Sequence, residues 1–403
     1  MTSAIVALKK SFASEKGLIH LNNAGLAPSS REAYNSVLYW MERFRAEGMH
    51  CNDAYLEAVD VARTQLSQLL NCESGEIAFF QSTAGGISQI AFGLKLNRGD
   101  EVLTWDQEYP SNLYPWKAAC DRAGATLRLV ETGQPYLNSN GFSAGHAGAH
   151  FINWQSTPSE RLIAAITDKT RVIAISWVQY QSGAITDLEA VIAVARARGI
   201  WTVVDGIQGI GLMPFDFKKL GVDAVCGGSH KWMLSPVGVG YLAVREERVR
   251  ELQPLIIGAA TYGTCDDPTD FACLPKTNAW KFEAGSKQVL EIVALGASAK
   301  LIRETGVATI LAETEHLSKR LVKGLLSAGL QVHSPHLESH PGSIVCLSDT
   351  TPEKNRRLEH ALRLNHISFA LRGPGIRLSP HAFNYEQEID RAVEILTKTH
   401  HSS

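Results

Sequence analysis

The sequence contains no long apolar run. None of its apolar stretches approaches the roughly 20 residues that a membrane-spanning helix needs. The opening segment, MTSAIVALKKSF, also lacks the apolar core and small-residue cleavage site of a secretory signal. We therefore expect a cytoplasmic protein that makes no contact with a membrane.

Excess charge and paired cysteines are also absent. The 39 Lys and Arg residues nearly balance the 41 Asp and Glu residues, and the basic residues are scattered. Because a nucleic-acid surface needs clustered positive charge, we expect no nucleic-acid partner. The 7 cysteines form no CxxC pair and show no metal-ligand spacing. Free thiols and the absence of a metal site are the corresponding expectations.

What the sequence does have is a regular alternation of elements. From about residue 60 to residue 260, short β-rich runs alternate with segments of helical period. This alternation predicts an α/β fold with a large, doubly wound, mostly parallel sheet. Ligands bind such sheets at the carboxyl ends of the strands. Four residues fall at or just beyond predicted strand ends and are expected around one site: Thr83, Tyr109, Tyr180 and Asp205.

The length of 403 residues is enough for two domains. Residues 258–278 are rich in Gly, Pro, Thr and Asp, as expected of a loop, and a long helical segment begins near Lys287. Short strands and a final helix follow. We predict a large α/β domain over residues 16–280 and a smaller α+β domain formed by residues 1–15 and 281–403.

Two residues carry the strongest chemical signal. Asp205 ends the β-branched run WTVVD, and Lys231 follows in GGSHKW. Taken singly, a strand-end Asp is most often a helix cap and a Lys is usually solvated. As a pair they are typical of proteins that hold pyridoxal phosphate. The lysine amine forms an imine with the cofactor aldehyde, and the carboxylate keeps the pyridine nitrogen protonated as an electron sink.

With these segments in place, the chain resembles the fold-type I pyridoxal-phosphate enzymes, and within them the class V aminotransferase superfamily. That superfamily contains cysteine desulfurases, C–S lyases and isopenicillin N epimerase. The resemblance extends from LNNAG near the amino terminus to the last helix. It implies that Lys231 carries the cofactor and acts as the general base, and that Asp205 faces the ring nitrogen.

The segment QSTAGGISQ opens a predicted helix, whose N–H groups and dipole favour a phosphate. The resemblance assigns the cofactor phosphate to this turn and to the two residues before the lysine: Thr83, Ala84, Gly85, Ser229 and His230. It also places Tyr109 flat on the cofactor ring and Gln208 at the phenolic oxygen. Tyr180 stands where desulfurases often have Asn.

The resemblance also implies a substrate subsite. Arg377 matches the arginine that binds the carboxylate of an amino acid with its two-pronged guanidinium, and Arg372 is a second candidate. Asn23, Ala24 and Gly25 resemble the loop that lines the substrate side. Ser286 resembles a hydroxyl that reaches the phosphate of the neighbouring subunit's cofactor, so a homodimer with shared sites is expected.

Departures from the family pattern limit the reaction. Gly228 replaces the usual phosphate-binding Ser, and no cysteine lies between Phe369 and Arg377, where sulfur-carrying desulfurases have theirs. Cys346 lies in a predicted strand. We expect chemistry at Cα or Cβ of a small amino acid, foremost a C–S lyase or desulfurase-like β-elimination without a persulfide cysteine. An amino-acid epimerase and a class V aminotransferase stay open, and a cofactor-free binding protein is a remote alternative.

Overall fold

The computed structural model describes residues 2–12, 17–131, 158–263, 273–335, 342–372 and 375–402. Its centre is a seven-stranded sheet with the order β2-β8-β7-β6-β5-β3-β4. In that order the strands are β2 (Ile77–Phe80), β8 (Gly240–Val244), β7 (Ala224–Gly228), β6 (Trp201–Asp205), β5 (Thr170–Ser176), β3 (Glu101–Trp105) and β4 (Thr126–Val130).

The sheet is mostly parallel, as predicted. Strands β7, β6, β5, β3 and β4 all run in one direction. Only β8 is reversed, and it pairs antiparallel with both β7 and β2. Because the two reversals cancel, β2 runs in the same direction as the parallel strands and ends at the same edge of the sheet.

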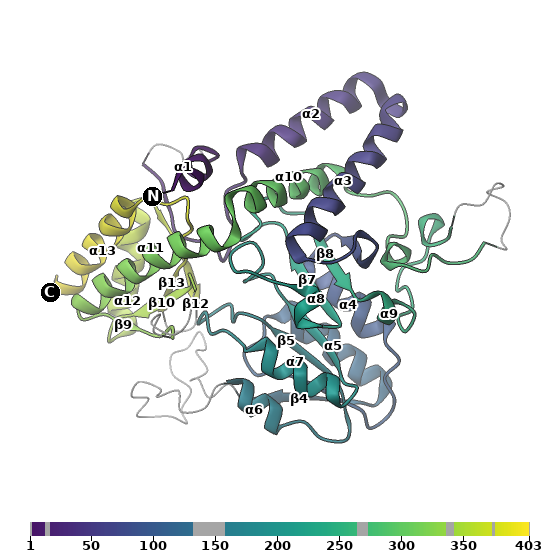
Figure 1. Ribbon diagram of the computed structural model, residues 1–403. Helices are drawn as coiled ribbons and strands as arrows, with labels where there is room; N and C mark the ends of the chain where they lie inside the picture. Colours follow the sequence, from purple (N-terminus) through teal and green to yellow (C-terminus); the bar gives the residue numbers. More distant parts are fainter. Residues whose placement is uncertain are drawn as a thin grey trace.

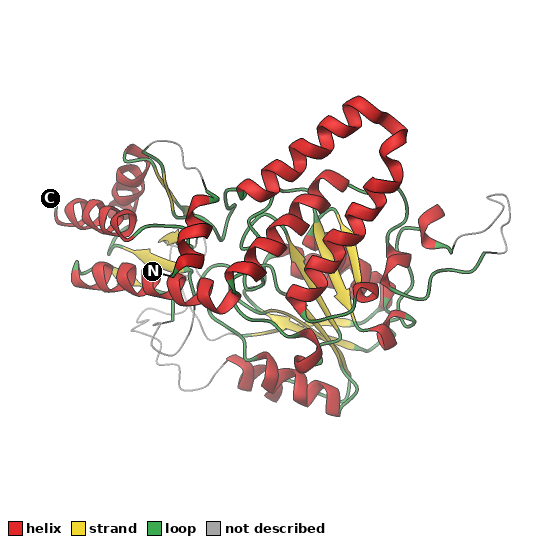
Figure 2. Ribbon diagram, turned by 45° about the horizontal axis from the view of Figure 1, so that its top comes forward, coloured by secondary structure: helices red, strands yellow, loops and turns green. Residues whose placement is uncertain are grey.

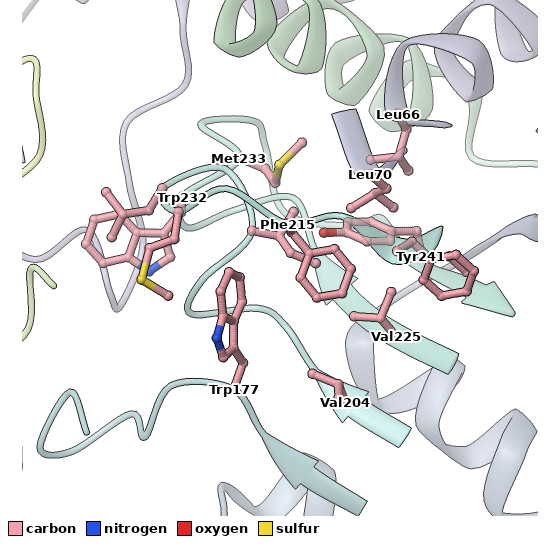
Figure 3. Packing of buried hydrophobic residues seen from close by; sticks show 14 of the residues in the cluster. Leu66, Leu70, Trp177, Val204, Phe215, Val225, Trp232, Met233 and Tyr241 are labelled. Carbon is pink, nitrogen blue, oxygen red and sulfur yellow. The ribbon is translucent and has the colours of Figure 1, made fainter. Parts of the chain in front are cut away.

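Helices cover both faces of this sheet (Figure 1). Neighbouring strand residues point to opposite faces, so Val203 joins one apolar core and Val204 the other. The first core includes α4 (Thr83–Gly93) and α5 (Pro110–Ala123). The second includes α3 (Asn52–Leu70), α7 (Leu188–Ala197) and α10 (Val289–Thr305). Figure 3 shows part of this second core, with Val204 and Val225 on the strands beneath Leu66 and Leu70.

A smaller domain is built on an antiparallel four-stranded sheet. Its strands are, in order, β12 (Ala370–Arg372), β13 (Gly375–Leu378), β10 (Val345–Ser348) and β9 (Gln331–Val332). It packs with α11 (Val307–Ser327), α12 (Pro352–Leu364) and α13 (Glu386–His401) around a third apolar core. The predicted final helix is therefore α13, and the long helix predicted near Lys287 is α10.

The amino-terminal segment returns to the carboxyl-terminal part of the chain. Helix α1 (Ser3–Lys10) packs against α10 and α11. Strand β1 (Ile19–His20) pairs in parallel with β11 (Ile367–Ser368), and Asn22 bridges to Ser379. The exact domain boundaries stay a prediction.

Helices α2 (Arg31–Glu47) and α3 form a long hairpin that extends from the sheet in both views (Figure 2). The remaining helical segments are short: η1 (Gly48–Cys51), η2 (Ser74–Glu76), α6 (Pro158–Ala164), α8 (Phe217–Leu220), α9 (Glu246–Val249), η3 (Ala259–Thr261) and η4 (Ala279–Phe282). Within the described ranges, no helix is both long enough and apolar enough to span a bilayer.

Candidate active site

The four strand-end residues predicted to share a site all follow strands that end at one edge of the sheet. Asp205 is the last residue of β6 and lies opposite Ser176, the last residue of β5. Thr83 begins α4 just after β2, and Tyr109 is the N-cap of α5 just after β3. The parallel arrangement of these strands is what brings the four segments together.

Lys231 and Asp205 are both buried, and each influences the other's protonation. Burial raises the pKa of Asp205 to about 6, against the opposing effects of a hydrogen bond from the Ile207 N–H (3.0 Å) and of the Lys231 charge. Burial lowers the pKa of Lys231 to about 8, although the Asp205 charge acts in the opposite direction. A lysine with this pKa exchanges a proton readily near neutral pH.

Two tyrosines lie above this pair. The Lys231 Nζ atom is 5.6 Å from the centroid of the Tyr109 ring, and the Tyr109 and Tyr180 rings meet edge to face at 5.1 Å. Tyr109 is 41% exposed. Its predicted stacking on the cofactor fits this geometry and stays a prediction.

The start of α4 offers an anion site. The Ser82 side chain caps the helix by accepting the Gly85 N–H at 3.2 Å. The buried Thr83 Oγ1 has no hydrogen-bond partner among the described residues. A Cβ atom added to Gly228 would lie 2.9 Å from that oxygen and 3.5 Å from the His230 ring. An orphan hydroxyl beside a helix N-terminus is the arrangement that a cofactor phosphate satisfies.

The two predicted donors before the lysine differ. The Ser229 hydroxyl already donates to the Pro236 carbonyl, so it must change partner to serve a phosphate. The His230 ring is half-buried beside Thr83, and burial together with the Lys231 charge lowers its pKa to about 4. The imidazole is therefore neutral at physiological pH and is free to donate one N–H.

Gln208 connects the lysine loop to the amino-terminal loop. Its Nε2 atom donates to the Ala24 carbonyl at 3.1 Å, and its Oε1 atom accepts the indole N–H of Trp232 at 2.9 Å. The His230 carbonyl accepts the Ala27 N–H at 2.9 Å. One amide hydrogen of Gln208 remains for the cofactor oxygen, and that role stays a prediction.

The substrate-side residues converge on Arg377. This buried side chain lies in β13 and donates through Nη1 to the Tyr180 carbonyl (2.7 Å) and through Nη2 to Asn22 Oδ1 (3.3 Å). Asn23 donates through Nδ2 to the Ser379 carbonyl at 2.8 Å, and Ser379 Oγ accepts the Ala24 N–H at 2.9 Å. A Cβ atom on Gly25 would lie 2.7 Å from Asn22 Oδ1, the atom that accepts from Arg377, so a larger residue would displace this side chain.

Sequence reasoning missed a second buried carboxyl, that of Glu108. It accepts the Ser176 N–H at 2.6 Å, the Ser176 hydroxyl and the Asn112 Nδ2 group at 3.1 Å. Burial, with a further contribution from the Asp205 charge, raises the pKa of Glu108 to about 7. Its sequence signal was its place immediately before Tyr109 and one helical turn before Asn112.

The remaining predicted features lie at the surface or in the core. Ser286 is exposed, and the neighbouring Lys287 pairs with Glu283 at 2.8 Å.

Five cysteines of the described residues are free and buried: Cys51, Cys72, Cys120, Cys226 and Cys346. The expectation that all seven are free is wrong for Cys273, which is disulfide-bonded. Cys265 lies outside the described residues. In the described part of the chain no cluster of metal-ligating side chains was found.

With this geometry in view, the family can be identified. A family model described as aminotransferase class-V matches residues 29–139 and 150–368. The chain belongs to this family. Membership confirms that the protein is an enzyme and that its cofactor is pyridoxal phosphate, and the Asp205–Lys231 pair and the orphan Thr83 hydroxyl fit that group.

Individual relatives differ in their named reactions. A probable cysteine desulfurase of Aeropyrum pernix is 27% identical over 331 residues, which span 78% of this chain and 75% of that protein. The isopenicillin N epimerase of Streptomyces clavuligerus is 26% identical over 397 residues, spanning 94% of both chains. The chain is thus similar to proteins that are named for two different reactions.

Solved structures share the fold. The apo structure of a cysteine desulfurase from Thermococcus onnurineus has a TM-score of 0.82 at 21% identity, covering 98% of this chain and 97% of that one. The cystine C–S lyase C-DES in complex with cysteine persulfide has a TM-score of 0.81 at 22% identity, covering 94% and 97%. This likeness confirms the predicted fold-type I architecture.

The first prediction concerns Lys231. Lys231→Ala should abolish both turnover and the lysine-bound absorbance of the cofactor, because no other amine occupies this position. Lys281→Ala is the control, since Lys281 is also buried but donates to the Val249 carbonyl away from the site. After borohydride reduction, peptide mapping should find the cofactor on Lys231, and a label on another lysine would contradict the assignment.

A second prediction concerns Asp205. Its folded-state pKa, about 6, exceeds the ordinary value of 3.8, so the folded protein retains this proton more tightly than the unfolded chain. The stability gained in this way is complete below about pH 4 and is lost as the pH rises through 6. Asp205→Asn should therefore stabilise the cofactor-free protein by about 1–3 kcal/mol at pH 8, with little change near pH 4. Turnover should fall on the order of a thousandfold.

Urea unfolding of the cofactor-free protein at both pH values tests this stability change. Asp223→Asn is the matched control, because Asp223 is equally buried but pairs with Arg248 at 2.8 Å and should lose stability when neutralised. If the Asp205→Asn variant is less stable than the parent at pH 8, burial does not raise the pKa of Asp205 in the folded protein.

Proposed function

We propose that the protein catalyses a C–S lyase or desulfurase-like β-elimination on a cysteine-type amino acid, without a persulfide cysteine. The observation that supports this most is the buried pair of Lys231 and Asp205, whose pKa values of about 8 and about 6 suit proton transfer at Cα. Bound pyridoxal phosphate supplies the electron sink that makes the Cα proton acidic.

Lys231 Nζ is the base in this proposal, and it would act as a free amine after the substrate amine has replaced it at the cofactor. It takes the proton from Cα, and the electron pair released there forms the Cα–Cβ double bond as the Cβ–S bond breaks. The sulfur leaves with the bonding pair, and the remaining product hydrolyses to pyruvate and ammonia. Asp205 supports the step by stabilising positive charge at the cofactor nitrogen from its buried position at the end of β6.

Binding residues orient the substrate for that step. Arg377 is fixed by Tyr180 and Asn22 and directs its guanidinium toward the α-carboxylate. Thr83, Ala84 and Gly85 hold the phosphate at the start of α4, with His230 beside them. Tyr109, whose ring centroid lies 5.6 Å from Lys231 Nζ, would stack on the cofactor ring.

The cysteines support direct release of sulfur. Burial raises the pKa of Cys346 to about 12, and its thiol lies in β10 with its Sγ atom 3.9 Å from the Arg372 carbonyl. Burial likewise raises the pKa of the Cys72 thiol, and it raises the pKa of Cys120 to about 11. Thiols of this kind are poor nucleophiles. None of the five free cysteines is suited to receive sulfur.

An epimerase is the second candidate. It is favoured by the similarity to the isopenicillin N epimerase, which extends over 94% of both chains. The same base would remove the Cα proton, but a proton would return to the opposite face and no bond at Cβ would break. A class V aminotransferase would share the first step. The cofactor-free binding protein is rejected, because the family to which the chain belongs consists of pyridoxal-phosphate enzymes.

We also propose that the enzyme is a homodimer. Ile256 and Ile257 are 68% and 63% exposed, an unusual state for isoleucines on a free surface. Their segment joins the one that leads to Ser286, because the Ala260 N–H donates to the Ala284 carbonyl at 3.0 Å. A partner subunit that covers the isoleucines would therefore also meet Ser286, the predicted ligand of the partner's phosphate.

The reaction is tested by its products. Purified enzyme incubated with L-cysteine, L-cystine and S-alkyl cysteines should release pyruvate, ammonia and the sulfur-containing group in equal amounts. D- and L-amino acids analysed by chiral chromatography test the epimerase, and 2-oxo acid acceptors test the transaminase. Inverted amino acid formed without pyruvate would favour the epimerase and reject elimination.

The assembly is tested by substitution of the exposed isoleucines. The double variant Ile256→Asp, Ile257→Asp should weaken dimerisation at least about a hundredfold, because two large apolar side chains would lose their burial. Leu364→Asp is the control, as Leu364 is 65% exposed but lies at the end of α12 in the small domain. Analytical sedimentation measures the dimer dissociation constant of both variants. A parent protein that is monomeric and fully active at nanomolar concentration would contradict the proposed shared site.

A further inference from the structure

Two guanidinium groups lie on the same face of the β12–β13 hairpin. In its register Arg377 lies opposite Ala370, and Arg372 lies opposite Gly375. Because side chains two residues apart share a face of a strand, Arg372 and Arg377 project to the same side. Gly375 cannot be enlarged, since a Cβ atom would lie 2.0 Å from the Leu347 carbonyl oxygen.

Tyr180 holds both arginines at the site. Its carbonyl accepts from Arg377 Nη1 at 2.7 Å, and its ring centroid lies 5.8 Å from the Arg372 guanidinium carbon. The Tyr180 ring in turn meets Tyr109, whose ring lies beside Lys231. Arg372 is thus connected to the catalytic lysine through two aromatic rings, and Arg377 is connected to the same tyrosine through its backbone carbonyl.

Neither arginine has an acidic partner among the described residues. Arg377 bonds a carbonyl and an amide oxygen, and Arg372 donates through Nη1 only to the carbonyl of Leu371, its own neighbour. The Nε atoms of both are buried and unpartnered within the described ranges. Arg63, another buried arginine, shows the usual arrangement, a two-pronged bond to Glu283 at 2.7 and 3.0 Å.

Arg372 and Arg377 together leave an excess of positive charge at the substrate side. The pKa of Lys231, lowered mainly by burial, is lowered further by the charges of Arg377 and Arg372. The pKa of Arg377 is lowered to about 10, first by burial and then by Arg372. One α-carboxylate would compensate only one of the two guanidiniums, and the second would remain without a counter-charge.

We infer that the site takes a cysteine-type α-amino acid whose side chain carries a second acidic group. Arg377 binds the α-carboxylate, and Arg372 binds a carboxylate or a similarly sized oxyacid at the far end of the side chain. This inference rests on the proposed function, because it takes the same site as the substrate site. It adds the substrate class, which the Lys231–Asp205 chemistry alone leaves open.

The test compares two ligands of equal size. L-Aspartate and L-asparagine differ only in the charge of the side-chain group, and their dissociation constants for the holoenzyme are measured from the change in cofactor absorbance. L-Aspartate should bind at least tenfold more tightly. Equal affinity for the two ligands would overturn the inference.

Variants distinguish the roles of the two arginines. Arg372→Gln should weaken L-aspartate at least tenfold and L-asparagine less than threefold, so that the preference disappears. Arg377→Gln should weaken both ligands to a similar extent, because both keep the α-carboxylate. A preference for L-aspartate that survives Arg372→Gln would overturn the role of Arg372.

Calorimetry with succinate and butyrate distinguishes this inference from the proposed function. Neither compound has an amine, so neither can react with the cofactor. Tighter binding of succinate, abolished by Arg372→Gln, supports the subsite even if no amino acid is turned over. Turnover of cysteine derivatives together with equal binding of succinate and butyrate would keep the proposed function and overturn the inference.

Discussion

Burial of Asp205 and Lys231 close enough for each charge to shift the pKa of the other group is the constraint on which the site depends. A carboxylate and an ammonium removed from water lose more hydration than their mutual attraction returns, which is why the pKa of each shifts toward neutrality. The fold maintains this unfavourable pair because β6 and the loop after β7 place them there. A positively charged cofactor nitrogen beside Asp205 would compensate the carboxylate.

The surrounding contacts keep the pair in place. Glu108 joins the end of β5 to the start of α5 through Ser176 and Asn112, and so fixes the segment that carries Tyr109. Gln208 does the same for the amino-terminal loop through Ala24 and for the lysine loop through Trp232. Glu108 reaches Ser176 across 68 positions and Gln208 reaches Ala24 across 184, so these two connections depend on the folded sheet.

Local patterns explain what the sequence could predict. The β-rich runs and helical periods were sufficient for the parallel sheet, and the strand ends located Thr83, Tyr109, Tyr180 and Asp205. Long-range partners left no local signal: Asn22 meets Arg377 across 355 positions, and Glu108 meets Ser176 across 68. The hydroxyl bond of Ser229 to Pro236 and the reversed direction of β8 also depend on packing that no short segment encodes.

The central claim is that Lys231 moves the Cα proton with the support of Asp205, whatever reaction follows. Proton exchange in D₂O tests it most directly, with L-alanine, L-serine and L-aspartate followed by NMR at the Cα–H signal. The account predicts exchange of at least one of them by the holoenzyme and none by Lys231→Ala. Exchange by Lys231→Ala at the parent rate, or no exchange of any of the three by the holoenzyme, would contradict it.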